Sequence, residues 1–304
     1  MYLFIFQIIW KDNIKVYVNK KFTVIENLHK NSFDSCRYFL DETNKRDLII
    51  TTSLDRHVKV INFKSNNSEI ILDLNFEEQK EAIINTACYI HETLVIPFSK
   101  EGIIKFYSLK PECLSQLDNA GFVLGLSKYY DEETKEHFIF SSNLNEIIAY
   151  NIDEFKIYHK FTPNTQEQVS KTSNFCFSEA IIIKTKQKQI ILAAPSFNTN
   201  KIYLWDFKKK IFKNSIPKYS NCGFTDIFLW QNKYIFASLK DSASQFIIID
   251  VETSEIIKDF KGIGKDTRGG QVRIVNHKSG KDFLISVSLS GRLSLYTVQE
   301  NEDN

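Results

Sequence analysis

The sequence has few cysteines and lacks the spacings that make cysteines structural or catalytic. Five cysteines occur in 304 residues, and no two of them form a C-x-x-C pair. They are Cys36, Cys88, Cys113, Cys176 and Cys222. An odd number of widely separated cysteines argues against a disulfide framework and against a cysteine-rich zinc site. We expect reduced thiols that are buried in the packing of a cytosolic protein.

Long hydrophobic runs are also absent. No stretch beyond the first ten residues approaches the roughly eighteen consecutive apolar residues that a membrane helix needs. Those ten residues, "MYLFIFQIIW", lack a basic start and a cleavage site of small residues, and the charged "KDN" follows them at once. This pattern indicates a β-strand and not a signal peptide. We therefore expect no membrane insertion, and a location in the cytoplasm or, as the alternative, in the nucleus.

An excess of charge of one sign is missing as well. Thirty-nine basic residues stand against thirty-seven acidic ones, which leaves a formal net charge of +2. Such a balance excludes a protein that is attracted as a whole to nucleic acid or to an anionic membrane. A charge-driven partner must use a local patch, and nucleic acid is not the expected partner.

Motifs that carry chemistry are not found. The six histidines show no H-x-x-H or H-E-x-x-H spacing, and G-x-S-x-G, the P-loop pattern and G-x-G-x-x-G do not occur. The nearest approach, "GIGKDTRGG" at 262–270, precedes a predicted strand, whereas a phosphate-binding loop is followed by a helix. The sequence therefore predicts no catalytic residue, no metal site and no cofactor.

What the sequence does contain is a repeated apolar run that ends in a bulky residue. The run occurs seven times, from "IKVYV" at 14 to "LSLYT" at 293, with intervals of 44, 46, 43, 55, 44 and 47 between the bulky positions. Those positions are Tyr17, Ile61, Tyr107, Tyr150, Trp205, Ile249 and Tyr296. A serine stands eight residues earlier in four of the seven repeats, at Ser53, Ser99, Ser142 and Ser288. A period near 45 through a whole chain predicts a repeat architecture.

Each run is accompanied by further runs of five to eight residues rich in Ile, Val, Phe and Tyr, separated by short polar turns. These runs are typical of consecutive antiparallel strands. Several are apolar at successive positions, which favours strands covered on both faces. Four strands in each of seven repeats predict an all-β, seven-bladed β-propeller. We expect one domain over 1–304, with blades near 1–30, 31–76, 77–118, 119–162, 174–217, 218–261 and 268–298.

The repeats resemble the WD-repeat family. Its pattern has a histidine before the innermost strand, Ser-x-Asp at a turn and Trp-Asp closing the third strand. Here His29, Ser53 and Asp55 match in the second repeat, where Ile61 and Asn62 replace Trp-Asp, and Trp205-Asp206 matches in the fifth. Ser99 matches in the third repeat, ahead of Glu101. The resemblance implies a divergent member in which these polar residues brace the blades and take no part in catalysis.

Two departures concern the ends and the longest interval. The first repeat begins with its second strand, at 3–9, and the last ends after its third, near Val298. The sequence therefore predicts an atypical or incomplete ring closure. The interval of 55 contains the polar segment "TPNTQEQVSKTS" at 162–173, which we expect to be an exposed loop.

The fifth repeat carries two lysine clusters in predicted turns. They are Lys184, Lys186 and Lys188 in one turn and Lys208, Lys209 and Lys210 in the other. Alternate turns of an antiparallel sheet emerge at the same end, so these clusters should be neighbours on one face, together with Lys278 and Lys281. The fourth repeat contributes the acidic "YDEETKE" to that face. One interpretation is that the lysines only keep the turns solvated. We predict that the clusters dock an acidic partner.

Loops on a rigid scaffold are where binding residues concentrate, and WD-repeat proteins are mostly scaffolds by resemblance. The sequence thus favours a non-catalytic protein-interaction subunit of a multiprotein assembly. One alternative is a propeller-type hydrolase, whose carboxylates or histidines would converge in space. The other is a reader of an acidic ligand, either phosphoinositide or nucleic acid, although the "FRRG" motif of lipid-binding propellers is absent.

Overall fold

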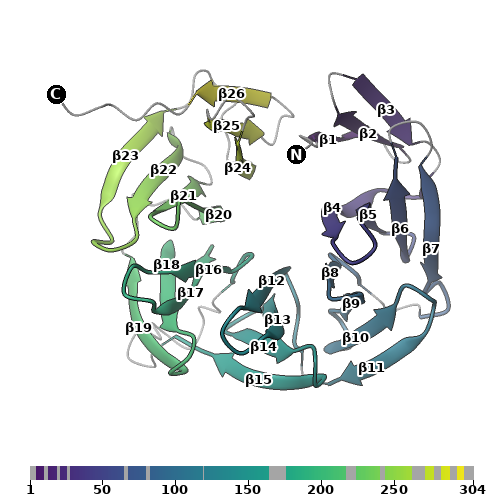
Figure 1. The fold of residues 1–304 in the computed structure, drawn as a ribbon, viewed down its shortest axis with the longest axis horizontal. Coiled ribbons are helices and arrows are strands. Elements are labelled where there is room, and N and C mark those ends of the chain that lie inside the picture. Colours follow the sequence, from purple (N-terminus) through teal and green to yellow (C-terminus); the bar gives the residue numbers. More distant parts are fainter. Residues whose placement is uncertain are drawn as a thin grey trace. The chain divides into compact units, whose positions relative to one another are not determined.

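The computed structural model shows antiparallel β-strands joined by short turns (Figure 1). It describes residues 5–9, 13–18, 21–25, 28–64, 68–79, 83–118, 120–163, 176–216, 224–239, 244–261, 271–276, 282–287 and 293–297. The chain divides into two compact units. Unit 1 is residues 1–144 with 148–160, and unit 2 is residues 145–147 with 161–304.

Unit 1 holds one three-stranded sheet and three four-stranded sheets, in each of which the strands neighbour one another in chain order. The first sheet contains β1 (Ile5–Ile9), β2 (Asn13–Val18) and β3 (Lys21–Ile25). The second contains β4 (Phe33–Asp41), β5 (Arg46–Ser53), β6 (His57–Phe63) and β7 (Glu69–Asn75). The third contains β8 (Cys88–Ile90), β9 (Thr93–Phe98), β10 (Ile103–Ser108) and β11 (Cys113–Leu117). The fourth contains β12 (Gly125–Asp131), β13 (Glu136–Ser142), β14 (Ile147–Asn151) and β15 (Lys156–Phe161).

Unit 2 holds two four-stranded sheets and one three-stranded sheet of the same kind. The first contains β16 (Ile181–Lys184), β17 (Ile190–Ser196), β18 (Lys201–Asp206) and β19 (Ile211–Ile216). The second contains β20 (Phe224–Trp230), β21 (Tyr234–Leu239), β22 (Ser244–Asp250) and β23 (Ile256–Lys261). The third contains β24 (Gln271–Asn276), β25 (Asp282–Val287) and β26 (Leu293–Thr297). Each terminal sheet of the chain thus has three described strands, which is the pattern behind the predicted atypical closure.

A buried apolar cluster spans the three four-stranded sheets of unit 1, and another spans the two four-stranded sheets of unit 2. In unit 1 one apolar cluster extends from Phe39 in β4 to Ile152 after β14, and in unit 2 one extends from Ile183 in β16 to Val251 after β22. Middle strands such as β9 and β14 are buried along their whole length, whereas the fourth strand β11 has no fully buried residue. Burial on both faces explains why these strands are apolar at consecutive positions.

The seven bulky repeat positions occupy the same strand of their sheets, as predicted. They lie in β2, β6, β10, β14, β18, β22 and β26, and the five with described side chains are at most 8% exposed. In four sheets the pairing with the next strand shifts register immediately before that position, which marks a β-bulge. The shifts fall between Val60 and Ile61, Phe106 and Tyr107, Leu204 and Trp205, and Ile248 and Ile249. A shared bulge shows that the repeat register is structural.

The residue after the bulky position holds the turn that follows the strand. Asn151, Asp206 and Asp250 accept hydrogen bonds from main-chain amides in the turn that follows, for example from Lys209 to Asp206 Oδ1 at 2.9 Å. Short polar side chains favour such turns because they satisfy amides that the ladder leaves open. The third strand therefore ends where this residue stands.

The structure tests only part of the remaining expectations. The four described cysteines are free thiols; Cys88 is buried, but Cys113 is exposed on the outer strand β11, so the expectation of burial is wrong there. Within the described residues no helix reaches the length and apolarity that a bilayer crossing requires. Residues 164–173 of the polar segment, the glycine cluster 262–270, Lys278 and Lys281 lie outside the described residues.

Candidate functional site

The turns at one end of the unit 1 sheets carry more exposed carboxylates than exposed lysines. In each four-stranded sheet the turn after the first strand and the turn after the third lie at the same end, because neighbouring strands run antiparallel. In unit 1 these turns carry exposed carboxylates, at Glu42, Glu92, Glu132, Glu133, Asp153 and Glu154. Turns of consecutive sheets touch, since Asn44 Nδ2 donates to Glu92 Oε1 at 3.4 Å. We call this region the acidic end.

Two further carboxylates shape these turns from within. Asp41 ends β4 and is buried, where its carboxylate accepts from Arg46 Nη2 at 2.7 Å and from the Asn44 amide at 3.2 Å. Burial raises the pKa of Asp41, but the hydrogen bonds with Arg46 and Asn44 lower it by more, so its pKa lies below the ordinary value. Asp131 ends β12 and accepts from the Glu133 amide at 3.1 Å. These two residues hold the turns and are not available to a ligand.

A pocket of about 540 Å³ opens between these turns in unit 1. Its lining combines aromatic, imidazole and carboxylate groups, including Glu42, Tyr89, His91, Glu92, Tyr130 and His137. Tyr89 and Tyr129 lie in its wall, and burial, followed by nearby carboxylates, raises the pKa of both phenols, which therefore stay neutral. Lys128 also lines the pocket, with its ammonium 5.2 Å from the centre of the Phe39 ring.

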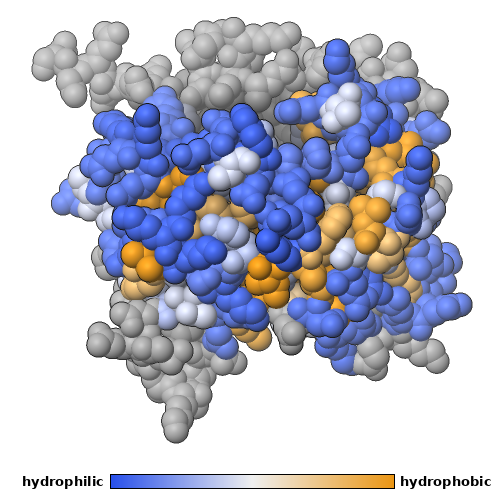
Figure 2. Space-filling view, turned by 60° about the horizontal axis from the view of Figure 1, so that its bottom comes forward, coloured by the Kyte–Doolittle hydropathy of each residue, from blue (hydrophilic) through white to orange (hydrophobic). Residues whose placement is uncertain are grey.

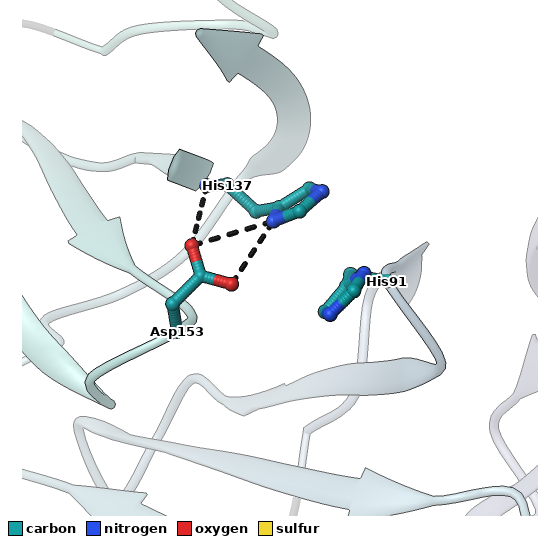
Figure 3. A group of neighbouring side chains, drawn as sticks. All are labelled: His91, His137 and Asp153. Carbon is teal, nitrogen blue, oxygen red and sulfur yellow. Dashed lines mark hydrogen bonds and ion pairs between the residues drawn. The ribbon is translucent and has the colours of Figure 1, made fainter. Parts of the chain in front are cut away.

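At the rim of this pocket two histidines and one carboxylate come together (Figure 3). The rings of His91 and His137 stack at 4.2 Å with 16° between their planes. His137 Nδ1 is 3.0 Å from Asp153 Oδ1, and the main-chain amide of His137 donates to Asp153 Oδ2 at 2.7 Å. His91 lies in the turn between β8 and β9, His137 in β13 and Asp153 in the turn after β14. We call these three residues the His-His-Asp cluster.

The histidine that the WD-repeat pattern singles out lies elsewhere in unit 1. His29 is buried, with Nδ1 at 3.0 Å from Asp55 Oδ1 and Nε2 at 2.8 Å from Thr51 Oγ1. Asp55 also accepts from the amides of Lys30 and His57, at 2.8 and 3.0 Å. Burial lowers the pKa of His29 by more than Asp55 raises it, so the net shift is downward. A neutral, enclosed imidazole with these partners ties the segment before β4 to β5 and to the following turn.

Two serines of the repeat pattern also tie neighbouring segments together, through hydrogen bonds to the main chain. Ser53 Oγ donates to the carbonyl of Asn31 at 3.2 Å and accepts from the Asp55 amide at 3.2 Å. Ser99 Oγ donates to the carbonyl of Val123 at 3.0 Å and so ties the end of β9 to the segment that leads into β12. Both hydroxyls are enclosed and engaged with main chain, which is a structural arrangement.

In unit 2 the repeat position is filled by an aromatic cluster. Trp205 is 1% exposed and packs against Phe161, Phe177, Tyr203 and Phe212 with ring centres 5.9–6.3 Å away. Its Nε1 donates to the carbonyl of Thr162 at 2.9 Å. The neighbouring Asp206 is buried and caps the turn after β18.

The lysine clusters lie in two turns of the sheet β16–β19. The pairings of Lys184 with Ile190 and of Ile191 with Asp206 place residues 185–189 and 207–210 at the same end of that sheet. The side chains of Lys186 and Lys209 are 76% and 68% exposed. Lys188 and Lys210 are exposed as well, whereas Lys184 and Lys208 are half-buried. We call residues 184–189 and 207–210 the basic turns.

Main-chain hydrogen bonds fix these turns. The Lys188 amide donates to the carbonyl of Thr185 and the Phe207 amide to that of Ile190, both at 2.9 Å. Lys186 Nζ lies 3.8 Å from Glu252 Oε1, a contact that links the first basic turn to the turn after β22. Exposed ion pairs of this length contribute little to stability. The backbone of the basic turns is therefore held in place by its own hydrogen bonds.

Sequence reasoning did not find the His-His-Asp cluster, because its members come from two turns and a strand and share no short motif. The signal that could have found it is positional: in consecutive repeats, His91 lies in the turn between the first two strands and His137 lies just after that turn. It also missed Thr51, the partner of His29, which lies two residues before Ser53 in the same strand. Alternation along a strand puts both on one face.

Comparison with known proteins rests on structure alone. No protein-family model and no curated protein sequence matches the chain. A chain in the crystal structure of the mitotic checkpoint complex matches with a TM-score of 0.69, covering 95% of this chain and 85% of that one at 12% identity. The fold is a β-propeller. At such low identity the likeness establishes the fold and leaves the function open.

Proposed function

We propose that the chain is a non-catalytic protein-interaction scaffold, a propeller subunit of a multiprotein assembly, which docks an acidic surface of a partner through its basic turns. The observation that carries the proposal is the pair of basic turns at one end of the sheet β16–β19. Clustered like charges repel one another, and a partner of opposite charge relieves that repulsion.

Two further observations support docking by polar contacts. On the face drawn in Figure 2, hydrophilic residues dominate and hydrophobic ones appear between them in separate patches. The similar chain belongs to a multiprotein complex, which supports a protein partner for a propeller of this kind. The turns are also preformed, so docking costs little ordering of the backbone.

The test is a charge reversal with a matched control. One variant carries Glu in place of the exposed basic-turn residues Lys186, Lys188, Lys209 and Lys210. The control carries Glu at four other exposed lysines, Lys30, Lys64, Lys110 and Lys258, and so has the same net charge. Affinity purification followed by mass spectrometry should recover the same partners with the wild type and the control. The reversed variant should lose at least one of them, and that partner should also dissociate as salt is raised.

Unchanged recovery by the reversed variant, at a melting temperature close to that of the wild type, would contradict docking through these turns. Binding of the wild type to phosphoinositide vesicles or to nucleic acid, lost on reversal, would favour a reader of acidic ligands instead. Turnover of a small ester or glycoside would favour a propeller hydrolase. These assays separate a protein partner from the two alternatives.

A further inference from the structure

The His-His-Asp cluster presents three metal-ligand atoms to one point. One ring nitrogen of His91, one of His137 and one carboxylate oxygen of Asp153 all lie within 4.8 Å of one another. Figure 3 shows the three side chains facing each other across a small gap. Two turns and the strand β13 supply them, at positions separated by 46 and 16 residues along the chain. This cluster is independent of the basic turns and of the proposed partner.

Two of the three ligands are already oriented. The carboxylate of Asp153 is fixed by the main-chain amide of His137 at 2.7 Å and by His137 Nδ1 at 3.0 Å (Figure 3). The amide of Ile152 in turn donates to the carbonyl of His137 at 2.9 Å, which anchors the turn that carries Asp153. The main-chain amide keeps the carboxylate oriented, and an ion bound at His137 Nδ1 would replace the proton that this nitrogen shares with Asp153.

The third ligand can close the site. A tetrahedral zinc ion with bonds of 2.0–2.2 Å needs ligand atoms about 3.4 Å apart, so closing the present spread requires a movement of roughly 1 Å or slightly more. The His91 side chain is exposed and stands on a two-residue turn, where both residues have positive φ angles of 44° and 59°. Rotation of an exposed ring on this turn supplies the movement without disturbing the core.

The donor set selects the class of ion. Two imidazoles and one carboxylate suit zinc and neighbouring first-row divalent ions, whereas calcium and magnesium prefer sites made wholly of oxygen ligands. Three protein ligands leave a fourth position for water. The carboxylates of the acidic end, Glu42 and Glu92 among them, raise the local concentration of cations around the site.

We propose that His91, His137 and Asp153 form a zinc site at the rim of the unit 1 pocket. The bound ion joins the turn between β8 and β9 to β13 and to the turn after β14, and so cross-links two neighbouring sheets of unit 1. Binding to the folded chain alone stabilises it by mass action. Zinc should therefore raise the melting temperature of the protein.

The experiment measures zinc binding to the full chain by calorimetry in chelator-free buffer, with the melting temperature as a second readout. The variants are His91→Ala, Asp153→Ala and the double change His91→Ala with His137→Ala. His57→Ala is the matched control, because His57 also pairs with carboxylates in unit 1, those of Asp73 and Glu77. We expect one zinc ion per wild-type or control chain, and an affinity lower by at least about 10-fold in each cluster variant, because losing a ligand costs no less than losing a group that supports one.

Cobalt provides an independent signature, because a tetrahedral nitrogen and oxygen site gives it visible absorption that is far more intense than that of the octahedral aqueous ion. We expect this absorption with the wild type and the control and not with the double variant. Equal affinity in the wild type and the double variant, or no zinc binding by the wild type, would overturn the site. His91 is exposed, so His91→Ala folds normally and gives a decisive answer even if changes at His137 disturb the sheet.

Discussion

In the sheet β4–β7 the repeat position holds Ile61, and the nearby histidine His29 is hydrogen bonded to Thr51 and Asp55. In the sheet β16–β19 the same position holds Trp205, which is surrounded by four aromatic rings and donates to a main-chain carbonyl. The bulge before the repeat position is present in both. A repeat can thus keep its backbone register while it divides the WD-repeat pattern between polar bracing in one sheet and aromatic packing in another.

The turns at the ends of the sheets differ in charge between unit 1 and the sheet β16–β19. In unit 1 the turns after the first and third strands carry several exposed carboxylates, and the His-His-Asp cluster lies at the same end, whereas the sheet β16–β19 carries the basic turns there. Strand pairing depends on apolar packing and main-chain hydrogen bonds, and it places no demand on the charge of a turn. Turn chemistry is therefore free to follow function, and the differences between turns indicate where to look for it.

The largest expected effect on stability comes from replacing Trp205. Replacement by alanine removes a fully buried indole and leaves its four aromatic neighbours beside a cavity, which should lower the free energy of unfolding by about 3–5 kcal/mol. Urea denaturation monitored by circular dichroism measures the loss. Ile211→Ala in the neighbouring strand is the control, since that side chain is 53% exposed and its removal should cost far less. Similar losses for the two variants would mean that the aromatic cluster does not hold this sheet.

A smaller effect is expected from the polar brace of unit 1. His29→Ala leaves Thr51 and Asp55 without their shared partner, and an unsatisfied buried polar group costs about 1–3 kcal/mol. The control His57→Ala changes a histidine whose two carboxylate partners are exposed, so its cost should be smaller.

The brace should also respond to pH. Because burial holds the pKa of His29 below its ordinary value of 6.5, the unfolded chain binds a proton more readily than the folded one. Stability from this residue is therefore complete above pH 6.5 and is lost as pH falls through that value toward the folded pKa. Between pH 7.5 and 5.5 the wild type should lose roughly 1 kcal/mol more than His29→Ala, at most. Parallel pH dependence of the two proteins would show that His29 titrates normally in the fold.

Much of the fold could be predicted from the sequence, because spacing and strand order are local properties. The repeat positions, the consecutive burial of middle strands and the short terminal repeats all follow from where Ile, Val, Phe and Tyr recur. The polar partners were harder. Ser53 was visible because it recurs at a fixed distance from the bulky residue, but Thr51 occurs at its position only once among the matched repeats.

The His-His-Asp cluster could not be predicted, because sequence spacing does not say which turns meet. His137 and Asp153 belong to the sheet β12–β15, and His91 joins them only once the neighbouring sheet packs beside it with its turns at the same end. The basic turns were easier, since both belong to one sheet, where antiparallel pairing alone determines that they are adjacent. Distances within a sheet can be reasoned from the sequence, whereas distances between sheets require the structure.

The smallest expected effect concerns two turns, one in the acidic end of unit 1 and one among the basic turns. Lys135, between β12 and β13, and Lys188, in the first basic turn, have positive φ angles of 63° and 60°. Glycine adopts this conformation without strain. The strain energy that the substitution removes exceeds the cost of the extra entropy that glycine loses on folding, which leaves a gain in stability of about 0.5–1 kcal/mol. Lys135→Gly and Lys188→Gly should therefore raise the free energy of unfolding equally, as measured by urea denaturation. Only Lys188→Gly removes a charge from the basic turns, so only it should weaken salt-sensitive partner recovery. Equal weakening by both variants would show that the partner responds to net charge or to turn geometry and does not recognise the basic turns.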